Sequence, residues 1–359
     1  MARILIETHH PAHIHFWKYP IRELQNRGHE VLMIARDRDV MRRLLEVYDW
    51  IPHEIPPRPN QKNRFPLREM FSRQWYVAKA IRRFRPAVVA SLMGSYTQSA
   101  KLLGVPNIIF TDSEFQHFNH RIAHPFADEI HTPECFYKPL GRRQRKYRSI
   151  HELAFLNERD FRPDPSVLMR YGLKGGAYIV VRLSAWNTLH DVKHRGLGES
   201  IRKFFKEHES QGPILLVAEE GKVPPGLESF RAEIAPEDFH GILALARFVL
   251  TEGASTASEA VCLGVPTVYV NSTEPRGYLN FLEKDTMLLK TFDEAAPGIT
   301  EANDWLGRLQ AASPPSDIGE REQFRSWLNA RCEDLVAYVV KVVERSAGSP
   351  GKDDKYDPR

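Results

Sequence analysis

Short apolar runs alternate with longer amphipathic segments along the first part of the chain. Residues 3–7 form one apolar run, residues 17–27 carry apolar positions at helical spacing, and residues 31–34 form a second run. Residues 87–91 and 106–110 repeat the apolar pattern on either side of another helical segment. Strand-length apolar runs that alternate with helical segments are typical of βαβ units. The pattern therefore predicts a parallel sheet covered by helices.

The same alternation starts again after an irregular, proline-containing stretch at residues 157–165. Strand-like runs at 177–181 and 214–218 flank a helical segment, and residues 249–270 follow as strand, helix and strand. With 359 residues, the chain is longer than one hydrophobic core usually supports, so two domains are expected.

We expect an α/β fold with two Rossmann-like domains, whose parallel sheets face a central cleft. Ligands of such sheets bind at the carboxyl ends of the strands. The predicted N-terminal domain spans residues 1–160 and the C-terminal domain residues 161–319. Apolar residues at helical spacing predict a closing helix over 320–347. Small and charged residues predict a disordered tail over 348–359.

The composition narrows the class of protein. Hydrophobic residues make up 42% of the chain and charged residues 27%, which is typical of a soluble globular protein, and no apolar run approaches the roughly 20 residues that span a bilayer. The chain enters an apolar run directly, without the pattern of a secretory leader. Its three cysteines lie far apart, which argues against a disulfide framework or a structural zinc site. We therefore expect a cytoplasmic protein.

Basic residues gather at positions 82–85 and 142–148, although the net charge of +4 is mild. Such runs usually form solvated faces. An anionic ligand, a membrane surface or nucleic acid are the functional alternatives. No recognition helix, zinc finger or RNA-binding signature supports nucleic acid. A location at the membrane periphery stays open, and so does the oligomeric state.

The segment at residues 250–270 contains a turn of small residues at the start of a helix. The turn consists of Gly253, Ala254, Ser255 and Thr256. Its lack of side-chain bulk lets a ligand approach backbone N–H groups, which predicts a cradle for a diphosphate. Glu252 adds a carboxylate at the strand end. However, Thr256 and Glu259 also fit a capping box, in which side chains satisfy those N–H groups instead.

The loop expected after the first strand carries four histidines among seven residues. They are His9, His10, His13 and His15. Because the pKa of histidine lies near neutrality, one of them is a candidate general base facing the cleft. Metal binding is an alternative, but Glu7 is the one nearby carboxylate. Surface or capping roles for all four are a third interpretation.

Several motifs resemble a prokaryotic family of GT-B-like proteins that is defined as a domain of unknown function. The motifs are HPAHIHFWKYPIRELQNRGHEV, FADEIHTPECF, RLSAWNTLHDVKHRG and TEGASTASEAVCLGVPTVYVNS. The family is related to the peptidoglycan GlcNAc transferases and to UDP-GlcNAc 2-epimerases, so the resemblance implies a GT-B fold and nucleotide-sugar chemistry. The transferases carry GGxGGH in the first loop, where this chain reads THHPAH. The glycines that would approach a phosphate are missing there, so the acceptor stays open.

The resemblance also implies roles for individual residues. His13 corresponds to the loop histidine and Glu259 to the carboxylate that binds the ribose. The other residues implied on the nucleotide-sugar side are Arg182, Ser184, Asn187, Glu252, the turn from Gly253 to Thr256, Asn271, Ser272 and Tyr278. Those expected on the acceptor side are His15, Gly94, Ser95, Asp112 and Ser113, with Glu114 as a further catalytic candidate.

The expected function is sugar transfer from a nucleotide-diphosphate sugar, expected to be UDP-linked, to an unknown acceptor, with no cofactor or metal. Asp37-Arg38-Asp39 spells the DxD triplet of metal-dependent transferases, but it opens a predicted helix, where acidic residues serve the helix dipole. One alternative is a UDP-sugar 2-epimerase that uses Glu114 and the histidines. Another is a non-catalytic nucleotide-sugar binder or a partner in polysaccharide assembly.

Overall fold

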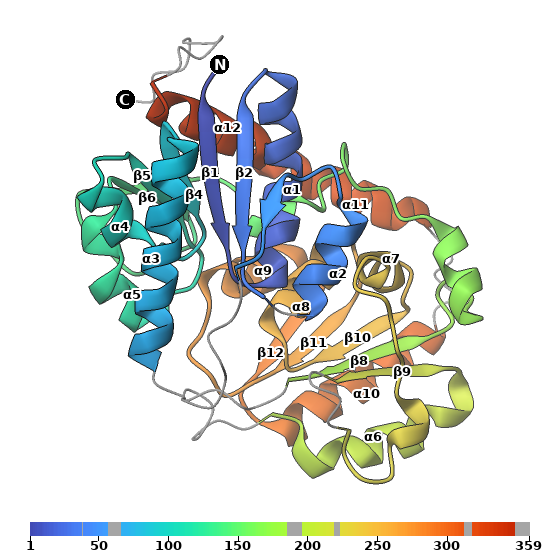
Figure 1. Ribbon diagram of the computed structural model, residues 1–359. Coiled ribbons are helices and arrows are strands. Elements are labelled where there is room, and N and C mark those ends of the chain that lie inside the picture. Colours follow the sequence, from blue (N-terminus) through green and yellow to red (C-terminus); the bar gives the residue numbers. More distant parts are fainter. Residues whose placement is uncertain (38, 57–65, 185–195, 219–222, 312–317, 349–359) are drawn as a thin grey trace. The chain divides into compact units, whose positions relative to one another are not determined.

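The computed structural model describes residues 1–37, 39–56, 66–184, 196–218, 223–311 and 318–348. The chain divides into two compact units. Unit 1 combines Met1–Phe155 with Cys332–Arg359, and unit 2 is Leu156–Arg331. Each unit holds one parallel sheet with helices packed on it (Figure 1). The predicted α/β class with two parallel sheets is confirmed.

Among the described residues, unit 1 has a seven-stranded sheet in the order β3-β2-β1-β4-β5-β6-β7, with all neighbours parallel. The strands are β1 (Arg3–Thr8), β2 (Glu30–Ala35), β3 (His53–Glu54), β4 (Val88–Ser91), β5 (Asn107–Phe110), β6 (Glu129–Pro133) and β7 (Gln144–Tyr147). Ile4, Leu5 and Ile6 are fully buried, because β1 is paired on both sides and covered on both faces. The loops at the carboxyl ends of β1, β4 and β5 therefore follow strands that are held in a well-packed core.

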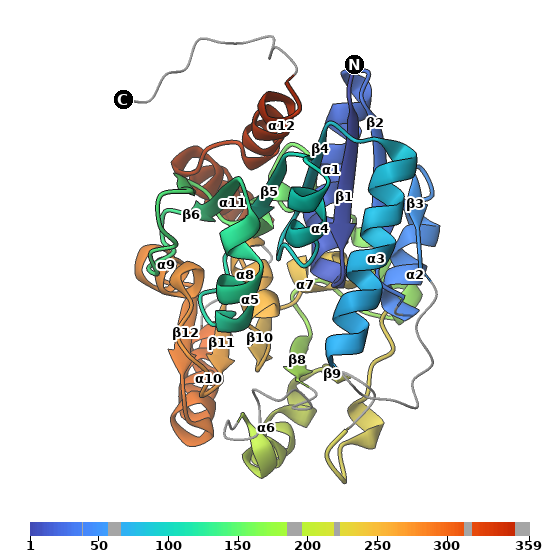
Figure 2. The same cartoon turned by 60° about the vertical axis from the view of Figure 1, so that its left-hand side comes forward.

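Helices cover both faces of this sheet (Figure 2). They are α1 (Pro11–Asn26), α2 (Asp39–Val47), α3 (Pro66–Phe84), α4 (Thr97–Leu102), α5 (His117–Ile122) and α12 (Leu335–Ser346), with 3₁₀ turns η1 (His124–Phe126) and η2 (His151–Ala154). α3 and α4 pack against one face through residues such as Val77, Ile81 and Ala100. α1 and α12 contact each other, and α12 also contacts β4 and β5.

α1 begins at Pro11, earlier than the start at residue 17 that the apolar periodicity predicts. His10 is the N-cap, and its Nδ1 accepts a hydrogen bond of 3.2 Å from the Ala12 N–H. Proline at the first helical position has no N–H to leave unsatisfied. The prediction that His13 and His15 lie in a loop is therefore wrong, because both belong to the first turns of α1.

In the described part of unit 2, a parallel sheet has the order β12-β11-β10-β8-β9. Its strands are β8 (Ile179–Leu183), β9 (Ile214–Ala218), β10 (Phe248–Thr251), β11 (Thr267–Val270) and β12 (Leu289–Phe292). The helices are α6 (Ile201–His208), α7 (Phe239–Ala244), α8 (Ala254–Cys262), α9 (Gly277–Thr286), α10 (Ala295–Ala311) and α11 (Ile318–Arg331), and the 3₁₀ turns are η3 (Pro165–Tyr171), η5 (Gly198–Ser200), η6 (Glu209–Gln211) and η8 (Glu228–Phe230). α6 and α10 contribute Ile201, Phe204 and Leu306 to the core on one face. α8 packs against β10 and β11, so the start of α8 follows directly from a buried strand.

The C-terminal segment forms two helices and not the single predicted helix over 320–347. α11 ends at Arg331, and α12 starts after Asp334, whose side chain accepts a hydrogen bond of 3.0 Å from the Ala337 N–H. A capping side chain of this kind favours a new helix start. α12 belongs to unit 1, where Glu344 lies 3.1 Å from His29. Of the predicted disordered tail, residues 349–359 lie outside the described residues.

None of the described helices has both the length and the apolar character that a bilayer-spanning segment requires.

Candidate functional site

A buried carboxylate marks the carboxyl end of β1 in unit 1. Glu7 is 2% exposed. Its Oε1 accepts a hydrogen bond of 2.9 Å from the Ser95 hydroxyl and forms an ion pair with Arg73 of α3. Burial raises the pKa of Glu7, but the charge of Arg73, the neighbouring His9 and the hydrogen bond from Ser95 outweigh it and bring the pKa to about 2. Glu7 is therefore a charged, firmly held group at neutral pH.

Two of the four histidines lie next to this carboxylate. The Nδ1 of His9 is 3.7 Å from the Oε2 of Glu7. The ring of His9 meets the ring of His13 edge to face, with 4.4 Å between centroids. His13 is 6% exposed, and its Nδ1 finds no hydrogen-bond partner among the described residues. Burial, and then the charges of neighbouring histidines, lower the pKa of His13 well below its usual value, so its imidazole is neutral at pH 7.

His15 has different neighbours from His13. It stands two residues further along α1, where a helix turns side chains to another side. Its ring centroid is 5.6 Å from that of Phe155 and 6.2 Å from that of Tyr48. The contacts of His15 are thus largely aromatic.

Gly94 and Ser95, expected on the acceptor side, have clear structural roles in the turn after β4. Gly94 has φ +73°, and a β-carbon there would overlap the side chain of Ile109. The hydroxyl of Ser95 binds Glu7, and its carbonyl accepts a hydrogen bond of 2.6 Å from Gln74. This turn holds Glu7 in place.

A second carboxylate and imidazole pair follows β5. The Oδ2 of Asp112 lies 3.2 Å from the Nδ1 of His151 in η2, and Ser113 donates a hydrogen bond of 2.9 Å to the other carboxylate oxygen. Burial raises the pKa of Asp112, but the charge of His151 outweighs it, so the pKa lies below its usual value. The side chain of Glu114 is fully buried. The ammonium group of Lys138 donates a hydrogen bond of 2.9 Å to the backbone carbonyl of Glu114.

In unit 2 the helix α8 starts at Ala254 with Gly253 as its N-cap. Gly253 has no side chain to cap the helix, and the hydroxyl of Thr251 accepts a hydrogen bond of 2.9 Å from the Gly253 N–H, which precedes the first helical turn. Thr256 already lies inside the helix, so the predicted alternative of a Thr256–Glu259 capping box is wrong. The first-turn N–H groups of α8 have no partner within the helix, and they can therefore donate hydrogen bonds to an anionic ligand at the helix start.

Arg182 places a cation at this helix start. It pairs in register with Thr251 across β8 and β10. Its Nε lies 3.7 Å from the position that a β-carbon on Gly253 would occupy, and its guanidinium lies over the ring of Phe239 at 5.4 Å. A guanidinium beside free helical N–H groups is a favourable environment for phosphate oxygens.

Glu252 holds backbone in place. Its carboxylate accepts hydrogen bonds from the N–H groups of Ser184 at 2.8 Å and Leu197 at 2.6 Å. The Asn271 side chain donates to the Glu252 carbonyl at 2.9 Å. These contacts fix the chain around Arg182. The predicted ligand contact Asn187 lies outside the described residues.

The remaining nucleotide-sugar candidates are on α8, α9 and the turn after β11. Glu259 is 7% exposed and lies 3.4 Å from the Nε2 of His240. Tyr278, in the first turn of α9, is buried. Ser272 lies in the turn after β11. Arg276, at the end of the same turn, donates hydrogen bonds to the hydroxyl of Tyr269 at 2.8 Å and to that of Thr273 at 3.0 Å.

Arg73, His151 and Arg276 are residues of these clusters that the sequence motifs do not single out. Arg73 lies nine residues before the basic run at 82–85, and His151 follows the basic run at 142–148. Arg276 alone carries a signal in the sequence, because it lies four residues after the end of the turn motif, in NSTEPRGY.

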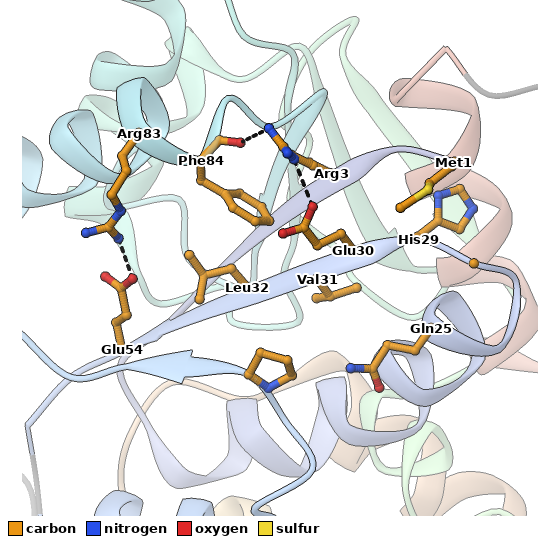
Figure 3. Close-up of a pocket in the computed structure, with 12 residues that line it drawn as sticks. Met1, Arg3, Gln25, His29, Glu30, Val31, Leu32, Glu54, Arg83 and Phe84 are labelled. Carbon is orange, nitrogen blue, oxygen red and sulfur yellow. Dashed lines mark hydrogen bonds and ion pairs between the residues drawn. The ribbon is translucent and has the colours of Figure 1, made fainter.

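An open pocket in unit 1 lies at the amino ends of the strands, whereas Glu7 lies near the carboxyl end of β1. It is lined by Met1, Arg3, Gln25, Gly28, His29, Glu30, Val31, Leu32, Pro52, Glu54, Arg83 and Phe84, near the amino ends of β1 and β2 (Figure 3). Arg3 pairs with Glu30 at 2.8 Å, and Arg83 pairs with Glu54. Its arginines therefore already have carboxylate partners. We place the candidate chemistry at the carboxyl ends of the strands.

Residues 2–297 of the chain match the family described as Protein of unknown function (DUF354). A protein from Methanocaldococcus jannaschii, Uncharacterized protein MJ0665, is 24% identical over 301 residues, which cover 79% of this chain and 86% of that protein.

Solved structures share the architecture. The co-structure of S. aureus MnaA with UDP has a TM-score of 0.67 at 11% identity and covers 99% of this chain and 100% of that chain. UDP-GlcNAc 2-epimerase from Neisseria meningitidis bound to UDP-GlcNAc has a TM-score of 0.60 at 12% identity, covering 95% and 99%. Acinetobacter baumannii MurG has a TM-score of 0.55 at 16% identity, covering 96% and 100%. At these identities the likeness establishes the fold, and the predicted GT-B class is confirmed.

Proposed function

The chain belongs to the DUF354 family, and we propose that it is an enzyme that binds a nucleotide-diphosphate sugar and transfers the sugar to an acceptor without a metal. The observation that carries this proposal is the pairing of Arg182 with the start of α8. The N–H groups of the helix and the guanidinium together match the charge and the hydrogen-bonding pattern of a diphosphate. As the leaving diphosphate gains charge, both groups bind it more strongly, which lowers the barrier.

The similar structures support a UDP-linked donor. MnaA was solved with UDP, and the Neisseria enzyme with UDP-GlcNAc. In this proposal Glu259 binds the ribose hydroxyls, while Asn271, Ser272 and Tyr278 lie on the sugar side. Glu252 acts indirectly, since its carboxylate holds the backbone of Ser184 and Leu197.

Acid–base chemistry falls to unit 1 in this proposal. Neutral His13 takes the proton of the acceptor hydroxyl while the new glycosidic bond forms. Its low pKa keeps it unprotonated at pH 7. His13→Ala is therefore expected to remove transfer while leaving donor binding intact.

A UDP-sugar 2-epimerase is the second candidate, and the group of acidic side chains after β5 favours it. Asp112 with its partner His151, and the buried Glu114, place carboxylates and an imidazole within one short region. Epimerisation of one bound sugar needs an acid and a base but no acceptor.

Binding is tested first by thermal shift with UDP, UDP-GlcNAc, other nucleoside diphosphates and ATP. A ligand that binds the folded state raises its melting temperature. We expect a UDP compound to do so, and Arg182→Met to abolish the shift. Arg308→Met is the matched control, because Arg308 is an exposed arginine on α10 of the same unit. The proposal fails if no nucleotide stabilises the protein, or if both variants respond like the native chain.

Turnover then separates the candidates. UDP-GlcNAc is incubated with the protein alone, and its C2 configuration and free UDP are followed by NMR. Inversion at C2 or release of UDP without an acceptor favours the epimerase. A donor that stays unchanged with the protein alone, and is consumed only when an acceptor is added, favours the transferase. A bound donor that no acceptor consumes indicates a nucleotide-sugar binder.

A further inference from the structure

Glu7 occupies a position where the fold itself needs only an apolar side chain. It continues the buried run Ile4–Leu5–Ile6 in the central strand β1. A buried charge destabilises a core unless it is paired. Here Arg73 and Ser95 bind one carboxylate oxygen, Oε1, and leave the other, Oε2, toward His9.

We propose that Glu7 is a positioning residue for the acid–base step. Its Oε2, 3.7 Å from the Nδ1 of His9, orients the imidazole of His9 by charge, and His9 holds His13 edge to face, so that His13 is placed to receive the acceptor proton. This inference rests on the proposed function. In the step, the acceptor oxygen bonds to the anomeric carbon, the bond from that carbon to the phosphate oxygen breaks, and the diphosphate leaves with the electron pair. The proton passes from the acceptor oxygen to the imidazole of His13 and later to water.

The charges around the pair explain why a carboxylate is needed. His10 from the start of α1, His151 from η2 and Arg73 from α3 all act on His13, and Arg36 after β2 and Arg73 act on His9. Each of these neighbours is a cation or becomes one on protonation. Glu7 is the negative group that faces His9, and its charge raises the pKa of His9 against the larger effect of burial. An imidazolium on the pair is therefore stabilised by Glu7.

The test uses Glu7→Gln, which keeps the size of the side chain and removes its charge. In protein labelled with ¹⁵N-histidine, NMR reads the tautomer and titration of each imidazole, with His9→Gln to assign the signal. We expect His9 to change tautomer population and to titrate at lower pH in Glu7→Gln. This measurement needs no substrate, so it tests the positioning role even if the proposed function fails.

Kinetics supply the second readout. With the substrate identified as above, kcat should fall about 10- to 100-fold, which is less than the roughly 10²- to 10⁴-fold loss expected for the general base itself, while the KM for the donor stays unchanged. The acid limb of the kcat profile should move to lower pH, because the base loses its carboxylate neighbour.

Two further variants serve as controls. Glu129→Gln is the matched control, because Glu129 lies 3.1 Å from His131 in the same unit, and this substitution should change His131 alone. Glu7→Gln with Arg73→Met removes both members of the ion pair, so it replaces the single variant if an unpaired Arg73 prevents folding. Native-like titration of His9 in Glu7→Gln overturns the proposal, and so does a native-like tautomer population of His9 in the double variant, where the opposing effects of Glu7 and Arg73 on the pKa are both removed.

Discussion

The guanidinium of Arg182 and the backbone of Gly253 are neighbours at the start of α8. The Nε of Arg182 is 3.7 Å from the site of a β-carbon on Gly253, and the hydroxyl oxygens of Thr251 and Thr256 are each 3.5 Å from it. These are ordinary contact distances, and Gly253 has φ −90°, which any residue adopts. The glycine is thus dispensable for the fold and leaves room for a ligand in front of the helix.

Gly253→Ala should therefore fold normally and bind the donor poorly. We expect stability to change by less than about 1 kcal/mol, while the nucleotide-induced thermal shift falls sharply because the methyl group occupies the approach to the N–H groups. Gly307→Ala in α10 is the control, since a β-carbon there meets nothing within 4 Å. It should raise stability by up to ~1 kcal/mol without altering binding. Undiminished nucleotide binding in Gly253→Ala would place the diphosphate elsewhere.

Gly94→Ala should destabilise unit 1. Its φ of +73° is unfavourable for alanine, and the new β-carbon overlaps Ile109. Strain and overpacking together should cost on the order of 2 to 4 kcal/mol, measured by urea unfolding. Gly104→Ala separates the two causes, because Gly104 has φ +67° but open space around it, so it should cost only about 1 kcal/mol. Equal losses in both variants would rule out the contact with Ile109 as a cause.

Stability should depend on pH through Glu7. The pKa of Glu7 is about 2 in the folded protein against an ordinary 4.5, so the folded state favours the carboxylate. Its contribution is complete above about pH 4.5 and is lost as the pH falls toward 2. The loss is on the order of 3 kcal/mol. Urea unfolding between pH 3 and 7 should show a steeper acid decline for the native chain than for Glu7→Gln, and parallel curves would contradict the assignment.

Glu252→Gln should weaken unit 2. The carboxylate accepts from two backbone N–H groups, those of Ser184 and Leu197, whereas an amide turns its own N–H₂ toward one of them. We expect a loss of about 1 to 3 kcal/mol and weaker nucleotide binding, since Arg182 lies two residues before Ser184. Glu228→Gln is the control, because Glu228 accepts one N–H of Gly226 at an exposed position. A loss of the same size in both variants would show that the pair of hydrogen bonds from Ser184 and Leu197 adds nothing to stability.

Local patterns in the sequence were sufficient for the fold class and for the turn at Gly253. Alternating strands and helices follow from apolar spacing, and a run of small residues after a buried strand indicates a helix start with little side-chain cover. The start of α1 was missed because its first residues are histidines and a proline, which carry no apolar periodicity. The cap at His10 is a single hydrogen bond, and no spacing rule predicts it.

The supporting partners could not be found in this way. Arg73 reaches Glu7 across 66 positions, and Asp112 and His151 meet only after the chain has passed through β6 and β7. Such pairs depend on the order of the strands and on how α3 packs, which are properties of the tertiary structure. The sequence therefore points to the histidines as candidates more readily than to the charged residues beside them.

The return of α12 to unit 1 has a consequence for biosynthesis. Unit 2 is an insertion, because α12, which completes unit 1, follows unit 2 in the chain. During synthesis, Tyr338 and Glu344, the partners of His131 and His29, are added only after unit 2 has been translated. The N-terminal sheet must therefore wait with one face incompletely covered, and a nascent chain that stalls before residue 335 would expose that face to chaperones.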